Sequence, residues 1–290
     1  MEIFMIFFIV LSVFSNVLND GLKNYVGKSS SKNENLIKKF QLLSFFTCFL
    51  ICAGLAFFES PSIYSFLLGI MFGTMTFLST HFLILAMAVG PMHITILIAT
   101  ASMLIPTLSG VFFFSEPFSI YKFIAILALI VFLYCASSGK KGGTFNWKWL
   151  LYCGINFLTG GTIGIIQKIH QSSAHRDEFY FFLASAFLVS ALIPMLMSIK
   201  QMGKGEKRKI SPKLLCIAVV SGLCVFAQYA INTRLSGVLP SQLFFPVING
   251  TNVVFGSVVA VVVFKEKMTK KQIVGMVGGM LSLIGICILP

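Results

Sequence analysis

Apolar runs of roughly 17 to 24 residues follow one another along the chain, and this succession most constrains how it can fold. Each run is long enough to cross a hydrocarbon core of about 30 Å as an α-helix. Of the 290 residues, 57% are hydrophobic and 11% are charged, which leaves too little polar surface for a water-soluble domain. The sequence therefore predicts a bundle of membrane-spanning helices.

Charges, prolines and glycines separate the runs and place ten predicted helices. These helices cover residues 3–19, 40–57, 63–88, 92–114, 119–137, 147–167, 179–199, 213–233, 241–264 and 271–289. The first run differs from a signal peptide because Glu2 precedes it in place of Lys or Arg and it lacks a small-x-small cleavage site. We expect it to remain as the first helix.

The net charge of +13 could suggest nucleic-acid binding, but in a membrane protein the informative feature is which connections hold the cations. The connections after the first, fifth, seventh and ninth predicted helices, counted together with the first residues of the helix that follows each, hold five, three, six and four Lys or Arg residues, which is 18 of 22. Cytoplasmic connections are enriched in these residues. We therefore expect these four connections in the cytoplasm, both termini on the opposite side, and no nucleic-acid partner.

An internal repeat is the strongest sign of organisation. A shift of 150 places residues 113–119 (FFSEPFS) on residues 263–269 (VFKEKMT), and the alignment continues through the following helix. Gly90-Pro91 falls beside Leu239-Pro240 within one position. Because each copy would hold five helices, an odd number, the second copy must cross the membrane upside down. Inverted repeats of this kind are typical of alternating-access transporters, whose substrate site lies near mid-bilayer between the copies.

The same motifs resemble those of EamA-type transporters of the drug/metabolite transporter superfamily, and the resemblance covers nearly the whole chain. They are a Gly-Pro before the fourth helix, the paired Glu116 and Glu266 after hydrophobic helices, and Gly275-x-x-Gly278-Gly279. The resemblance implies an all-α membrane protein of ten transmembrane helices, arranged as two inverted five-helix repeats (5+5) around a central cavity. The EamA-like repeats would span residues 1–139 and 147–290, with the fifth and tenth helices at the periphery.

Such transporters move amino acids, nucleotide sugars, drugs and other metabolites, commonly as exporters or exchangers. They are often described with cytoplasmic termini, which differs from the orientation that the Lys and Arg count of this chain favours. The related small multidrug resistance proteins use a Glu in their first helix to exchange protons for cationic drugs. All nine carboxylates of this chain lie at or beyond the ends of the predicted helices, so we expect none at mid-membrane. This argues against a carboxylate-coupled antiporter for lipophilic cations.

Neutral polar residues lie deep inside the predicted helices, where a polar side chain needs a partner, water or a solute. The substrate-binding candidates are Asn16, His81, Asn156, Gln228, Tyr229, Asn232, Asn249 and Asn252. Asn249 and Asn252 are at i and i+3 on one helix face, as Gln228 and Asn232 are at i and i+4. These carboxamides could line a cavity or could bond between helices, and the sequence leaves both readings open.

Three residues are candidates for coupling or gating. His81 lies well inside a helix and could titrate near physiological pH, although a buried histidine can equally serve packing. Lys23, three residues after Asp20, and Lys168 end corresponding helices of the two repeats. The two lysines could attract anionic solutes or gate access, or they could be ordinary snorkelling lysines.

No metal ligands, cofactor site or catalytic cluster is expected, and an enzyme is not predicted. Cys48 and Cys52, one helical turn apart in an apolar segment, fit packing, and no histidines have metal-ligand spacing. Small-residue patterns such as Gly69-x-x-x-Gly73 predict close helix packing and leave a homodimer open.

The sequence thus predicts a carrier for a small polar metabolite, such as an amino acid-like solute, in the cytoplasmic (inner) membrane, with the solute and the lipid bilayer as partners. Alternating access by export or exchange is the expected mechanism. Efflux of organic cations is the alternative, and an enzyme acting on lipid-linked substrates is a weaker one.

Overall fold

The computed structural model describes residues 2–29, 34–114, 120–137, 146–202, 211–265 and 268–288. Every regular element in these ranges is an α-helix. The helices are α1 (Glu2–Ser29), α2 (Glu34–Ala56), α3 (Ile63–Val89), α4 (Met92–Ala101), α5 (Leu104–Phe114), α6 (Ile120–Ser137), α7 (Trp147–Gln171), α8 (Phe179–Met202), α9 (Pro212–Val238), α10 (Ser241–Val262) and α11 (Lys270–Ile288).

Polar side chains lie inside the bundle and apolar ones cover its outside. Asn24 and Thr76 are fully buried, whereas Phe58 and Phe112 are 89% and 78% exposed. A water-soluble protein rarely exposes so many large apolar side chains, and such a surface suits a hydrocarbon solvent. Within the described residues, eight helical segments are long and apolar enough to cross a membrane. The chain is a multi-pass integral membrane protein.

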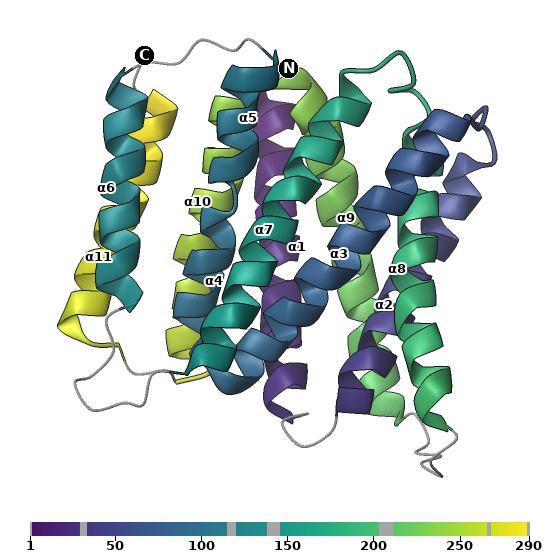
Figure 1. The fold of residues 1–290 in the computed structure, drawn as a ribbon, viewed down its shortest axis with the longest axis horizontal. Helices are drawn as coiled ribbons and strands as arrows, with labels where there is room; N and C mark the ends of the chain where they lie inside the picture. Colours follow the sequence, from purple (N-terminus) through teal and green to yellow (C-terminus); the bar gives the residue numbers. More distant parts are fainter. Residues whose placement is uncertain are drawn as a thin grey trace.

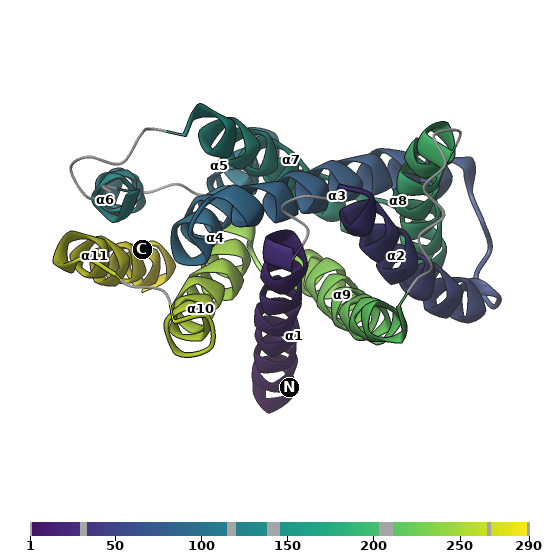
Figure 2. The same cartoon turned by 90° about the horizontal axis from the view of Figure 1, so that it is seen from below.

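The bundle is elongated, with a helix pair at each end. Helix α2 packs on α8 at one end, and α6 packs on α11 at the other (Figure 2). The remaining helices fill the middle, where α1 contacts α3, α9 and α10. Figure 1 shows α1 beginning and α11 ending at the same face, which we call the terminal face. Helices α1, α6, α8 and α10, which precede the four Lys/Arg-rich connections, end at the opposite face (Figure 1).

Helix α1 continues to Ser29, well beyond its predicted end at residue 19. Asp20 therefore lies inside the helix, and the expectation that every carboxylate lies at or beyond a helix end is wrong for this residue. Lys23 forms an ion pair with Asp20, with 3.1 Å between Nζ and Oδ1, so the helix can continue past both charges. Gly27 also permits the extension, because a Cβ there would meet the backbone oxygen of Ile84 on α3 at 2.8 Å.

The fourth predicted helix, 92–114, is interrupted in the middle of the bundle. It forms α4 and α5, separated by Ser102 and Met103. Pro106 explains the break, because proline has no N–H and its ring clashes with the carbonyl four residues earlier, that of Ser102. Broken helices often border the substrate sites of transporters, where the freed backbone groups face a cavity.

The main apolar core among the described residues lies where α2, α3, α7, α8 and α9 meet. Gly73 of α3 sits directly against Ala186 of α8, with no room for a Cβ, and Ser190 Oγ donates to the Gly73 carbonyl at 2.8 Å. The predicted role of Gly69 and Gly73 in close helix packing is confirmed, since a Cβ at Gly69 would also meet α8.

Candidate functional site

A cavity of about 140 Å³ lies in the middle of the bundle between α1, α3, α4, α5, α7, α9 and α10. It has space for on the order of ten water molecules and is smaller than the pockets of about 300–1,000 Å³ that hold drug-sized ligands. Its polar lining consists of Asn16, Asn19, Asp20, Lys23, Ser79, Thr80, Thr100, Ser102, Asn156, Gln167, Gln228, Tyr229, Asn232, Asn249 and Asn252.

One face of α1 supplies the charged part of the wall. Asn16, Asn19, Asp20 and Lys23 are spaced i, i+3, i+4 and i+7, so they form one stripe along the helix. The side chains of Lys23 and Asp20 are 9% and 7% exposed. A desolvated charge needs a partner of opposite charge, and Asp20 and Lys23 are partners of each other. Among the described residues that line the cavity, Asp20 and Lys23 carry the formal charges, and the sum of the two charges is zero.

Asn252 of α10 joins this charged region from the opposite wall. Its Nδ2 lies 3.5 Å from Asp20 Oδ2, a long hydrogen bond, and its Oδ1 has no partner. Asn249, one turn earlier, donates through Nδ2 to the Phe245 carbonyl of its own helix at 2.8 Å. The two carboxamides therefore lie on the cavity wall with part of their hydrogen-bonding capacity unused.

Two other carboxamides on the wall bond between helices. Asn156 of α7 donates to the carbonyl oxygen and the hydroxyl of Ser79 on α3, at 2.8 and 2.9 Å. Asn232 of α9 accepts from Ser12 of α1 at 2.6 Å. These residues combine the two roles that the sequence left open, because they line the cavity and also hold its walls together.

The structure brings together most of the predicted site residues. The candidates on the wall are Asn16, Asn156, Gln228, Tyr229, Asn232, Asn249, Asn252 and Lys23. Apolar side chains complete the lining, among them Phe244, Phe245 and Ile248. That these residues bind a substrate stays a prediction.

His81 lies outside this lining. Its Nδ1 is 2.8 Å from Oε1 of Gln41 on α2, and its ring stacks on Phe77 with 5.3 Å between centroids. The partner is 40 positions away in sequence, so the sequence offered no sign of it. This surrounding fits the packing role that was one of the two interpretations of His81.

Lys168 also lies apart from the cavity wall. Its Nζ is 3.4 Å from the carbonyl oxygen of Leu239, at the C-terminal end of α9. A lysine beside the last carbonyls of a helix is favourably placed, because those groups carry partial negative charge. The two lysines predicted as counterparts thus have different surroundings, since Lys23 faces the cavity.

Asp20, Asn19 and Gln167 also line the cavity, and the sequence reasoning did not select them. Asp20 and Asn19 fell at the predicted end of the first helix, and Gln167 at the predicted end of the sixth. The i+3 and i+4 spacing from Asn16 was the signal that could have placed Asn19 and Asp20 on one face with it. Within the residues that the structure describes, no group of three or more His, Cys, Asp or Glu could hold a metal ion.

Comparisons with known proteins agree with this architecture. A model of the EamA-like transporter family matches residues 147–288. A solved structure, described only as the crystal structure of a protein, is similar over 98% of this chain and 99% of its own, with a TM-score of 0.63 and 13% identity. At this identity the likeness concerns the fold alone. A search of curated proteins found no match.

Proposed function

Residues 147–288 belong to the EamA-like transporter family of the drug/metabolite transporter superfamily, and from this premise we propose that the chain carries a small, net-neutral polar solute across the cytoplasmic membrane by alternating access. The observation that carries the proposal is the neutralised Asp20–Lys23 pair on the wall of a central, carboxamide-lined cavity.

The charge of the cavity favours one class of solute. An unpaired carboxylate would suit an organic cation, and an unpaired lysine would suit an anion. A carboxylate beside an ammonium suits a zwitterion, whose own ammonium and carboxylate can pair with Asp20 and Lys23. The surrounding carboxamides provide both donors and acceptors. The volume of about 140 Å³ favours a solute of amino-acid size.

Support for two five-helix repeats comes from the positions that line the cavity. Adding 144 to lining positions 16, 19, 20 and 23 of α1 gives 160, 163, 164 and 167 of α7, which also line it. Adding 149 to 79, 80 and 83 of α3 gives 228, 229 and 232 of α9. The same shift relates 96, 99, 100 and 103 of α4 and its break to 245, 248, 249 and 252 of α10. We take residues 1–139 and 147–290 as the two halves.

Helix packing supports the same division. If the halves are equivalent, α1, α2, α3 and α4/α5 correspond to α7, α8, α9 and α10. Each contact between the halves should then have a counterpart with the helices exchanged. The contact of α1 with α9 has its counterpart in α7 with α3, that of α2 with α9 in α8 with α3, and that of α1 with α10 in α7 with α4 and α5. Helix α1 runs away from the terminal face and α7 runs toward it (Figure 1). The helices α6 and α11, with 18 and 19 residues, bring the proposed count of spans to ten.

The proposed mechanism is rocking of the halves about the cavity, which exposes it to one side at a time, with export or exchange as the mode. The Lys/Arg-rich connections favour the face opposite the terminal face as cytoplasmic. Ion pairs and hydrogen bonds between the halves would be exchanged as they rock. In the intermediate state, closed to both sides, the solute would be bound between Asp20 and Asn252.

The proposal is tested by thermal unfolding of the purified protein with neutral amino acids, each compared with its methyl ester and its N-acetyl derivative. A ligand of the folded state stabilises it by about 2.7 kcal/mol at a concentration of 100 times Kd. We expect stabilisation by a zwitterion and little by the cationic ester or the anionic N-acetyl form. Stabilisation by esters or lipophilic cations alone would contradict the proposal. It would support the second candidate, efflux of organic cations through Asp20.

A further inference from the structure

Two carboxylates at the terminal face cap each other's helices across the proposed halves. Glu59, in the α2–α3 connection, accepts through Oε1 from Tyr180 N–H at 3.0 Å and through Oε2 from Phe181 N–H at 2.7 Å. These donors belong to the first turn of α8. Glu178, immediately before α8, accepts through Oε2 from the N–H of Ser62, the N-cap of α3, at 3.0 Å.

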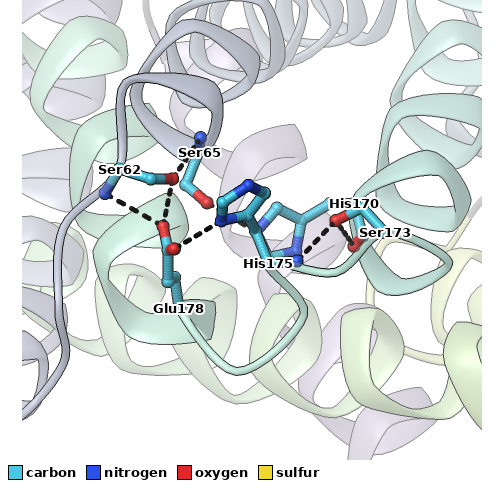
Figure 3. Close-up of polar contacts among 6 residues, drawn as sticks. All are labelled: Ser62, Ser65, His170, Ser173, His175 and Glu178. Atoms are coloured by element: carbon cyan, nitrogen blue, oxygen red, sulfur yellow. Dashed lines mark hydrogen bonds and ion pairs between the residues drawn. The ribbon is translucent and has the colours of Figure 1, made fainter.

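The direction of the Glu178 side chain is informative because it does not cap its own helix. Figure 3 shows Glu178 pointing to Ser62, whose hydroxyl also donates to it. The Ser62 hydroxyl in turn accepts from Ser65 N–H at 3.2 Å, so the chain of hydrogen bonds enters α3. An anion at a helix N-terminus is stabilised by the unpaired N–H groups and the helix dipole. Each half therefore places a carboxylate at the N-terminus of a helix of the other half.

Histidines add two further contacts across the same boundary. His175 Nδ1 is 2.7 Å from Glu178 Oε1, and the His175 ring stacks on Tyr64 of α3 at 5.2 Å between centroids. His170, at the end of α7, lies with Nε2 3.2 Å from Ser65 Oγ (Figure 3). The contacts with Tyr64 and Ser65 join α3, from the first half, to His175 of the α7–α8 connection and His170 of α7, from the second.

We propose that Glu59 and Glu178 form a reciprocal latch that holds the two halves together at the terminal face and so keeps the cavity closed on that side. This inference rests on the proposed alternating access. The close contacts of Gly69 and Gly73 with α8 lie about 10 and 16 Å along α3 from Ser62, so the latch lies beyond them at the end of the α3–α8 contact. Opening the terminal face separates the N-termini of α3 and α8, and both sets of caps must break.

Two cysteine reporters test the latch without any solute. Gln167→Cys lies one turn from the end of α7 at the terminal face, and Leu83→Cys lies on the cavity wall nearer the other end of α3. A membrane-impermeant maleimide is applied from each side, with exposed Cys216 replaced by Ser. The latch variants are Glu59→Ala, Glu178→Ala and the double variant. Asp177→Ala is the matched control, because Asp177 is an exposed carboxylate in the same connection.

We expect the latch variants to label Gln167→Cys from the terminal face at least about tenfold faster, since each removes charge-assisted hydrogen bonds. Labelling of Leu83→Cys from the opposite face should fall in the same variants, while Asp177→Ala changes neither rate. Unchanged rates in the double variant would overturn the latch, as would faster labelling at both reporters, which indicates unfolding. If the reporter proteins without latch substitutions are labelled from neither side, the proposed alternating access fails, and the latch with it. If these proteins are labelled and the latch substitutions leave the labelling rates unchanged, the latch alone is rejected.

Discussion

Asp20 and Lys23 lie one turn apart on α1, with 3.1 Å between Oδ1 and Nζ, and both are more than nine-tenths buried at the wall of the central cavity. A buried ion pair contributes little net stability relative to an apolar pair, but either charge left alone is costly. The pair is therefore better explained by what it does in the cavity than by its effect on folding.

Neutralising one member of this pair should destabilise the protein more than neutralising both. Asp20→Asn or Lys23→Gln leaves one desolvated charge, at a cost of about 3 kcal/mol, the lower end of the usual range because the cavity beside it has space for water. The double variant should recover most of this stability and still fail to bind a zwitterion. Thermal unfolding and ligand binding measure the two effects. Additive losses in the double variant would show that the charges do not act as a pair.

Removal of the Asn249 side chain should impair transport and leave the fold intact. Asn249 lies on the cavity wall and bonds within its own helix, so Asn249→Ala should change the free energy of unfolding by less than about 1 kcal/mol. Thr251→Ala is the matched control, because Thr251 bonds to Val247 on the same helix and does not line the cavity. Transport in proteoliposomes should fall at least about tenfold for Asn249→Ala and stay unchanged for the control. Parallel losses of folding and transport would assign Asn249 to packing.

The succession of helices and eight of the fifteen polar residues that line the cavity could be predicted from sequence, because a polar side chain deep in an apolar segment needs a partner, water or a solute. Two predictions about individual helices were wrong. The predicted end of the first helix at residue 19 moved Asp20 out of the membrane, since a charge usually ends an apolar run. The interruption at Ser102 was missed because Pro106 lies among apolar residues of a continuous run.

Contacts between distant segments were beyond sequence reasoning. Gln41 is a partner of His81 from another helix, and the residues that bond to Glu59 and Glu178 lie more than 110 positions from them along the chain. No local pattern encodes such pairs, because they depend on how α3 packs against α2 and α8.

His81 should not couple protons to transport. Its ring bonds to Gln41 and packs on Phe77 away from the cavity wall, so titration there would not sense the solute. His81→Gln keeps a polar group near Gln41 and should cost about 1 kcal/mol of stability. The pH dependence of transport should be the same in the variant and the parent. A flattened pH profile in His81→Gln would contradict this placement.

Two glycines of α7 should respond in opposite ways to alanine. A Cβ at Gly164 would lie 2.8 Å from Pro106 Cγ and 3.0 Å from Phe245 Cε1, so Gly164→Ala should distort the cavity and lower transport. A Cβ at Gly154 meets nothing within 4 Å, and Gly154→Ala should stabilise the helix by about 0.5–1 kcal/mol. Unfolding and transport assays on both variants decide this. Normal transport in Gly164→Ala would show that the cavity wall is not closely packed there.

The contribution of Glu178 should persist through the physiological pH range and weaken only in acid. Burial alone would raise the pKa of Glu178, but hydrogen bonds from Ser62, Ser65 and His175 outweigh it and lower the pKa from 4.5 to about 2. A lowered folded-state pKa stabilises the protein above the unfolded value, and this stabilisation is lost as pH falls from about 4.5 toward 2.

The measurement is the difference in Tm between the parent and Glu178→Gln from pH 8 to 3.5. The titratable groups facing Glu178 are His175, in its own connection, and His170, at the end of α7. Both proteins should therefore carry His175→Asn, which removes the closer of these titrations. The difference should be constant above about pH 5.5 and shrink below about pH 4.5. A difference that grows in acid would have the wrong sign for a stabilised carboxylate.

The most direct test of the central claim is counterflow in proteoliposomes loaded with the unlabelled zwitterion that best stabilises the protein. The account predicts rapid entry of the labelled zwitterion, no entry of its cationic methyl ester, and loss of exchange in the Asp20→Asn, Lys23→Gln double variant. Counterflow of the cation alone, or exchange of the zwitterion that survives in the double variant, would contradict a cavity that selects net-neutral solutes through this ion pair.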